Sequence, residues 1–181
     1  MTSLFNPDER RFLLELARRS IEGALKGERR FDPKVTEKRF LDKRGAFVSL
    51  KVDGELRGCV GYPLPYKPLY KTIIEMAAAA ATQDFRFSTL RAEELPRTKI
   101  EISVLTLPEA VKDPKEVEVG RHGIIISKGG CKGLLLPQVP EEYNWDRETY
   151  LGHGCLKAGL DKNAWQRGAK IEVFEAEVFS D

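Results

Sequence analysis

Apolar residues near the N-terminus recur every three or four positions, which is the spacing of an amphipathic helix. Ahead of this stripe, Asn6 favours a helix start because its side chain can cap free backbone N–H groups, and Pro7 suits the first helical position. Gly27 favours the end of the helix. The sequence therefore predicts a helix whose apolar face comprises Phe12, Leu13, Leu16, Ala17, Ile21, Ala24 and Leu25.

Strand patterns, either short apolar runs or alternating apolar and polar residues, occupy much of the remaining chain. Residues 46–52 and 56–60 flank Asp53-Gly54, a dipeptide typical of tight hairpins. A second hairpin is predicted around a pair of glycines, and two further strands are predicted singly. These strands cover residues 123–128, 131–136, 100–104 and 170–179.

Two more helices are predicted, at residues 69–82 and at about residues 146–158. The first contains Ala77 to Ala81, which are strong helix formers with very small side chains. A neighbouring element can come close to such a face, so we expect this helix to be packed centrally. Gly152 and Gly154 weaken the prediction of the second helix, because glycine disfavours a helix interior.

The elements follow one another as helix, hairpin, helix, strand, hairpin, helix and strand. Because hairpins dominate, we expect an α+β fold, with a mostly antiparallel sheet and helices packed on it. In the last strand the apolar phase shifts between Val173 and Phe174, as a β-bulge would require. Residues 28–44 look irregular, and no linker divides the chain, so residues 1–181 are interpreted as a single domain.

Composition narrows the range of functions. Thirty Lys and Arg oppose 28 Asp and Glu, and a net charge of +2 gives no electrostatic case for nucleic acid as the main partner. No apolar run approaches the roughly 20 residues of a membrane span, and the N-terminus lacks a signal-peptide pattern. Cys59, Cys131 and Cys155 are odd in number and widely spaced, so we expect free thiols in the reducing cytoplasm.

Leu56-Arg57-Gly58-Cys59-Val60-Gly61 is the most distinctive string in the chain, and it resembles the signature of the AMMECR family, with Val60 in place of the usual Ile. The resemblance covers about residues 10 to 179. Five further family blocks follow in order. They are Asp84-Phe85-Arg86-Phe87, Ile100 to Leu105, Gly120-Arg121-His122-Gly123, Leu135 to Val139 and Cys155 to Gly159.

This resemblance implies an α+β fold with two unequal subdomains and a cleft between them. It also implies that prokaryotic members are encoded near a Memo-like protein and a radical-SAM protein, which are therefore the expected partners. It does not supply a reaction. The chain has no three-cysteine cluster motif, so it is not itself the radical enzyme.

Cys59 is the leading chemical candidate. Gly58 and Gly61 within a strand pattern indicate a bulge or a close backbone approach, which would leave the thiol uncrowded. Arg57 could favour the thiolate, since a nearby positive charge lowers the pKa of a cysteine. The alternative is that Cys59 is a small buried apolar residue and that the glycines serve packing.

His153 and Cys155 lie two residues apart and could share a site only on irregular backbone, because on a helix they point about 200° apart. The alternative is a helix end with a buried Cys155. Structural zinc sites usually place paired ligands at short spacing, and the chain has no such pair. We therefore predict neither a metal site nor a cofactor.

Asp84 and Arg86 flank Phe85 and would project to the same face in a strand. They could clamp an anionic ligand, or they could form an ordinary ion pair that closes the preceding helix. Phosphate-loop, dinucleotide-binding and serine-hydrolase signatures are missing, so the pattern indicates no reaction class.

Two hypotheses stay open. In the first, the protein is an enzyme or an enzyme component with a cleft near Cys59. Cys59 would be a nucleophile or contact, Arg57 and Arg86 anion clamps and Asp84 an orienting group, with His153 as a further site residue. In the second, it is a non-catalytic module that binds a protein or a nucleic acid through the same groove.

Overall fold

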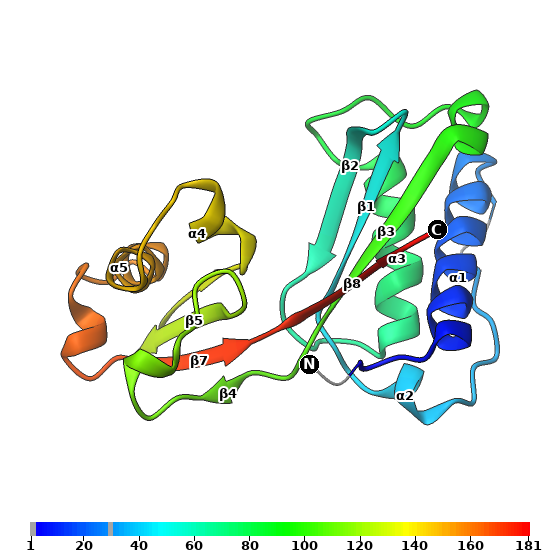
Figure 1. The fold of residues 1–181 in the computed structure, drawn as a ribbon. Coiled ribbons are helices and arrows are strands. Elements are labelled where there is room, and N and C mark those ends of the chain that lie inside the picture. The colour runs from blue at the N-terminus through cyan, green and yellow to red at the C-terminus, as the bar shows by residue number, and fades with distance from the viewer. Residues whose placement is uncertain (1–2, 29–30) are drawn as a thin grey trace. The chain divides into compact units, whose positions relative to one another are not determined.

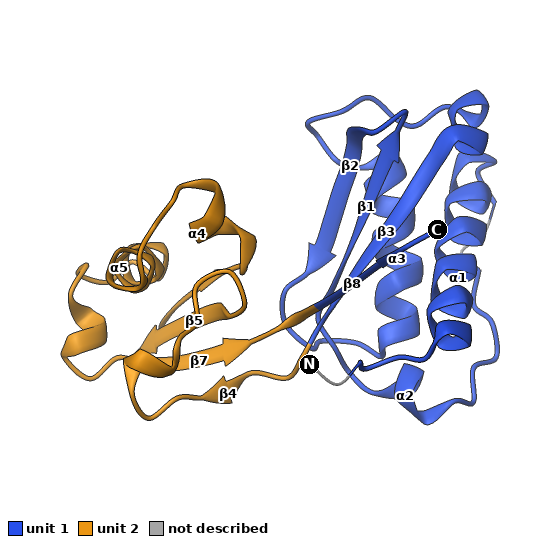
Figure 2. Cartoon of the chain, in the orientation of Figure 1, with its two compact units in different colours: residues 1–105, 177–181 blue, residues 106–176 orange. Residues whose placement is uncertain are grey.

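The computed structural model describes residues 3–28 and 31–181. The chain divides into two compact units, which Figure 2 distinguishes by colour. Unit 1 comprises residues 1–105 and 177–181, and unit 2 comprises residues 106–176. Each unit has its own antiparallel sheet and its own core, so the α+β class is confirmed. Among the described residues the strands form two sheets of four strands each, not the single sheet that the sequence suggested.

Unit 1 contains a sheet with strand order β2-β1-β3-β8 and helices that cover one of its faces (Figure 1). Its helices pack through the alternating buried positions of β1 and β3. The core joins these residues to the apolar faces of two long helices. The elements are α1 (Pro7–Leu25), α2 (Lys38–Leu41), β1 (Ala46–Val52), β2 (Glu55–Tyr62), α3 (Leu69–Thr82), β3 (Thr98–Leu105) and β8 (Ala176–Ser180).

Local sequence accounts for the ends of these elements. Asn6 caps α1 by accepting from the Glu9 N–H at 2.9 Å, while the Glu9 carboxylate accepts from the Asn6 N–H at 2.7 Å. Asp53 and Gly54 have positive φ angles of 52° and 88°, which matches the tight hairpin predicted between β1 and β2. The short helix α2 lies in the stretch that was expected to be irregular.

Unit 2 is built on a sheet with strand order β4-β7-β5-β6. Helix α5 packs on β5 and β6, and the predicted hairpin of β5 and β6 is confirmed. Tyr150 lies fully buried in this core, and its hydroxyl lies within hydrogen-bond distance of three backbone carbonyls, those of His122, Leu135 and Leu136, to any one of which it can donate its proton. The elements are β4 (Glu109–Ala110), β5 (Gly123–Lys128), β6 (Cys131–Leu135), α4 (Gln138–Glu142), α5 (Arg147–Lys157) and β7 (Lys170–Phe174).

The predicted last strand, residues 170–179, is wrong as a single element. It is two strands, β7 and β8, which are interrupted at Glu175 and belong to different sheets. The shift of apolar phase next to Phe174 therefore marks the passage of the chain from one sheet to the other, not a bulge. Within the described residues, no helix is long and apolar enough to cross a membrane.

Candidate functional site

Cys59 lies on β2 opposite Ser49 of β1. The Ser49 hydroxyl donates to the Cys59 sulfur at 3.1 Å, and the cysteine is half-buried. The backbone N–H and C=O of Cys59 are bound by side chains from outside the hairpin, so this is a non-hydrogen-bonded pair in the ladder. In such pairs the two side chains approach closely, which explains the contact between hydroxyl and sulfur.

The two glycines beside Cys59 serve close packing. A Cβ on Gly58 would stand 2.1 Å from the backbone oxygen of Ala80 on α3. A Cβ on Gly61 would stand 2.3 Å from the ring of Phe47. The small face of α3 and these glycines therefore allow β2 to lie directly against the helix and the Phe47 ring.

Asp84 follows the end of α3 and fixes the outer edge of β2 at Cys59. Its buried carboxylate accepts from the Cys59 N–H at 2.8 Å, and from Nε and Nη2 of Arg86 at 3.0 and 2.7 Å. Nη2 of Arg86 also donates to the Cys59 carbonyl at 3.2 Å. The two side chains thus satisfy both backbone groups that a neighbouring strand would otherwise bind, which protects this edge from strand pairing.

This arrangement favours the charged forms of both Asp84 and Arg86. The hydrogen bonds from Arg86 are the main cause that holds the pKa of Asp84 well below its usual range, with a further contribution from the Cys59 N–H. The pKa of Arg86 is raised, first by Asp84 and to a smaller extent by the neighbouring Cys59 side chain. Asp84 and Arg86 lie in a turn, not in a strand, and they form the ion pair after the helix end that was one of the two alternatives.

Arg57 makes a second set of bonds with the segment that follows Asp84. Its guanidinium donates to Glu94 at 3.0 and 3.2 Å, and also to the backbone oxygens of Ser88 and Thr89. Arg57 and Glu94 are largely buried, and Arg57 is the main cause that lowers the pKa of Glu94 to about 2. Arg86, distant in sequence, is therefore the arginine at Cys59, whereas the adjacent Arg57 secures the 83–91 loop.

Phe85 is the residue that the sequence interpretation overlooked. Its exposed fraction is 96%, although Asp84 and Arg86 on either side of it are held in hydrogen bonds. The next aromatic residue, Phe87, is half-buried, with the Arg86 guanidinium 5.4 Å from its ring centre. The position of an aromatic residue between two charged ones, just after a helix end, was the available signal.

His153 belongs to unit 2, where it has partners of its own. Its ring stacks on Trp145 with centroids 3.9 Å apart, and Trp145 stacks in turn on Tyr143. Regular α5 carries Cys155 into the core, where burial raises the pKa of that thiol. The interpretation of Cys155 as a buried residue near a helix end is thus confirmed.

Within residues 3–28 and 31–181, no three His, Cys, Asp or Glu side chains lie close enough together to hold a metal ion. The groups available for a ligand near Cys59 are the thiol itself, the Ser49 hydroxyl and the half-exposed Arg86 guanidinium. This set could contact an anion or an electrophilic carbon.

Comparison with known proteins decides the family. The AMMECR1 family model matches residues 14–179. The chain belongs to the AMMECR1 family. A protein of Methanopyrus kandleri is 47% identical over 96% of this chain and 89% of its own length. A protein of Methanosarcina barkeri is 43% identical over 96% of this chain and 90% of its own length.

A solved structure agrees with this AMMECR1 assignment. The crystal structure of an uncharacterized protein from Pyrococcus horikoshii has a TM-score of 0.81 and 39% identity, and the match covers 99% of this chain and 94% of that one. In the present AMMECR1 chain, the Leu56–Gly61 string forms most of β2, and the Asp84–Phe87 string forms the turn that holds it. The first two blocks of the resemblance are therefore one structural unit.

Proposed function

We propose that the protein is a docking module, which binds a partner protein through Phe85 and the 83–91 loop. The single observation that carries this proposal is the near-complete exposure of Phe85 on a loop whose backbone is secured on both sides. An aromatic ring buries a large apolar area when it enters a partner's pocket, and aromatic anchors dominate many interfaces.

The loop is preorganised for this role. The Phe87 N–H donates to the Asp84 carbonyl at 3.0 Å, and the Leu90 N–H donates to the Ala81 carbonyl at 2.7 Å. Arg57 adds two bonds to backbone oxygens in the same loop. A loop that is already ordered loses little conformational entropy on binding, so more of the contact energy appears as affinity.

Charge around Phe85 indicates the chemistry of the partner. Three arginines, at positions 57, 86 and 91, oppose the two carboxylates Asp84 and Glu94. The side chain of Arg91 is 73% exposed and that of Arg86 is 47% exposed. A partner that offers an apolar pocket with an acidic rim would complement this surface.

The Memo-like and radical-SAM proteins expected from the family resemblance are the partners that we propose for this surface. In this account the protein is a non-catalytic component that acts with them. Asp84, Arg57 and Arg86 all form hydrogen bonds within the chain, which supports a structural role for these side chains.

Quantitative binding of the two candidate partners to immobilised full-length protein tests this function. Phe85→Ala should weaken binding by at least about tenfold, the scale of an aromatic hot spot. Leu107→Ala is the matched control, because Leu107 is an exposed apolar residue of unit 2, and it should bind like the wild type. No binding of either partner, or equal binding by Phe85→Ala, would contradict the proposal.

A second candidate function is thiol chemistry at Cys59. The observation that favours it is the position of the sulfur, 3.1 Å from the Ser49 hydroxyl and beside the Arg86 guanidinium. Its test is the rate at which the folded protein reacts with a neutral thiol reagent at pH 7. An activated Cys59 must react faster than the exposed Cys131, and a slower reaction rules this function out.

A further inference from the structure

The sheet of unit 1 has two edge strands, β2 and β8, and their outward backbone groups differ in how they are protected. At β2, Asp84 and Arg86 occupy the outward N–H and C=O of Cys59. On β8, whose sequence is Ala-Glu-Val-Phe-Ser, we find neither a lysine nor a proline, the residues that commonly protect an edge. Among the described residues, β3 is the only strand that pairs with β8.

The direction of the free backbone groups follows from one hydrogen bond. The N–H of Asp181, next to the end of β8, donates to the Ile100 carbonyl of β3 at 3.2 Å. Successive N–H groups of a strand point to opposite sides, so those of Ser180 and Val178 point away from β3. Both residues are exposed, and the part of the chain that the structure describes offers no backbone acceptor to either N–H group, so another extended chain can bind there.

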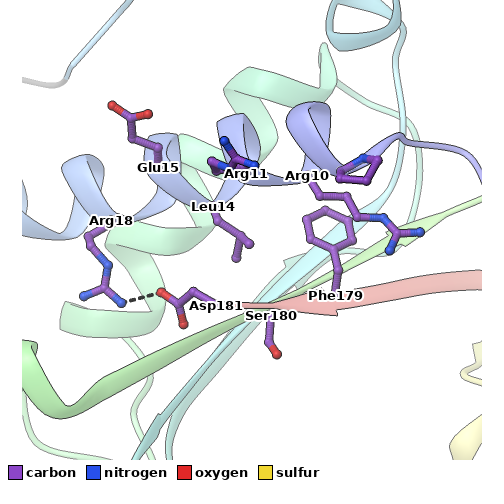
Figure 3. Close-up of a pocket in the computed structure, with 9 residues that line it drawn as sticks. Arg10, Arg11, Leu14, Glu15, Arg18, Phe179, Ser180 and Asp181 are labelled. Carbon is purple, nitrogen blue, oxygen red and sulfur yellow. Dashed lines mark hydrogen bonds and ion pairs between the residues drawn. The ribbon is translucent and has the colours of Figure 1, made fainter.

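A groove of about 580 Å³ adjoins this edge, between α1 and β8 (Figure 3). Leu14 of α1 and Phe179 of β8 point into it from the two sides. An ion pair between Arg18 and Asp181 lies at one end. At the other end the Arg10 guanidinium lies 5.8 Å from the centre of the Phe179 ring. An apolar centre is thus bounded by charged ends.

The groove is lined by three arginines, at positions 10, 11 and 18, and by the two carboxylates Glu15 and Asp181, so its cations outnumber its anions and favour an acidic ligand. Arg10 is bound by the buried Glu177, and Arg18 is bound by Asp181. The side chain of Arg11 is 78% exposed, and its contact with Asp8 at 3.4 Å is equally exposed. Solvent-exposed pairs of this kind are weak, so Arg11 remains available to a carboxylate from outside.

We infer that β8 and the groove beside it form a second binding site, which takes an extended acidic peptide segment of a partner protein. The segment adds to the sheet as a fifth strand through the backbone groups of Val178 and Ser180. One apolar side chain lies on Leu14 and Phe179, and an acidic side chain two positions away on the same face reaches Arg11. Main-chain bonds supply affinity in this mode of recognition, and alternate side chains supply specificity.

The test uses a short synthetic peptide of alternating threonine and valine, with one central leucine and a glutamate two positions from it. Two matched peptides serve as controls: one has lysine in place of the glutamate, and the other is N-methylated at alternate amides so that it cannot pair with a strand. Binding is followed by NMR of the full-length protein. Resonances of Leu14, Val178 and Ser180 should shift saturably with the glutamate peptide.

Both controls should bind at least about tenfold more weakly, the N-methylated peptide because its backbone bonds are lost and the lysine peptide because its charge is reversed. Arg11→Glu should reverse the preference between the glutamate and lysine peptides. Lys34→Glu is the matched control, because it reverses an exposed charge outside the groove, and it should leave the preference unchanged.

Equal binding of the glutamate and N-methylated peptides, shifts confined to other residues, or no binding at millimolar peptide would each overturn this inference. A second copy of the chain could also occupy this edge, and measurement of the molecular mass in solution tests that alternative. A dimer with slowly exchanging amides at Val178 and Ser180 would show that the edge is already paired, and it would also overturn the inference. None of these outcomes depends on Phe85, so they are independent of the docking function proposed above.

Discussion

Gly58 of β2 lies so close to Ala80 of α3 that a Cβ on the glycine would stand 2.1 Å from the alanine carbonyl oxygen. Both partners of this contact are backbone, so neither can turn aside as a side chain would. The approach requires glycine on the strand and a small residue on the helix. It also fixes the position of β2 against α3, and therefore the position at which the Cys59 N–H reaches the Asp84 carboxylate.

Gly58→Ala should destabilise unit 1 strongly, by roughly 3 kcal/mol or more, because overpacking against backbone forces the strand and the helix apart. Chemical denaturation provides the measurement. Gly130→Ala serves as the control, because no atom lies within 4 Å of its added Cβ, and it should change stability by less than about 0.5 kcal/mol. Similar losses in the two variants would contradict the packing role.

Glu94 should make stability depend on pH in the acid range. Its folded pKa of about 2 is lower than the ordinary value of 4.5, so its contribution to stability is fully present above about pH 4.5 and is lost as pH falls toward 2. Glu94→Gln should flatten this part of the curve of unfolding free energy against pH. A curve as steep in the variant as in the wild type would show that Arg57 does not hold the carboxylate as described.

Asp84→Asn should release the edge of β2 while preserving the shape of the side chain. The variant loses the charge that binds Arg86. Because the carboxylate is buried and accepts several hydrogen bonds, we expect the free energy of unfolding to fall by about 2–4 kcal/mol. Amide hydrogen exchange at Cys59 should accelerate, since its N–H loses a charged acceptor. Unchanged exchange at Cys59 would contradict the assignment of Asp84 as the acceptor.

The three cysteines should react in an order set by exposure. In the docking account Cys131 reacts first, the half-buried Cys59 more slowly, and the buried Cys155 only when the protein unfolds. Mass spectrometry of partly labelled protein gives this order. The second candidate function requires Cys59 to react first, so the same experiment separates the two accounts.

Much of the fold could be predicted because local signals in the sequence agree with the final packing. The capping residue Asn6, the Asp53-Gly54 turn and the alternation along β1 and β3 each indicate one element with a defined length. The passage from β7 to β8 was missed because a shift of apolar phase looks the same in a bulge and at a change of sheet. The division into units depends on such long-range pairing and is not visible locally.

The candidate site was predicted only in part. Cys59, Asp84 and Arg86 do come together, but Arg57 faces Glu94, a pairing between residues 37 positions apart. Sequence adjacency suggested that Arg57 would lie at the thiol, whereas the closure of the 83–91 loop brings Arg86 there instead. His153 was grouped with Cys59 by residue type alone, and its stacking on Trp145 belongs to unit 2. The cleft expected between the two parts stays a prediction.

The most direct test of the docking account is the affinity of the Memo-like and radical-SAM proteins for the wild type and for Phe85→Ala, measured side by side with Leu107→Ala. The account predicts that at least one partner binds the wild type and Leu107→Ala equally, and binds Phe85→Ala at least about tenfold more weakly. Equal affinity for all three proteins, or no binding to any of them, would contradict it.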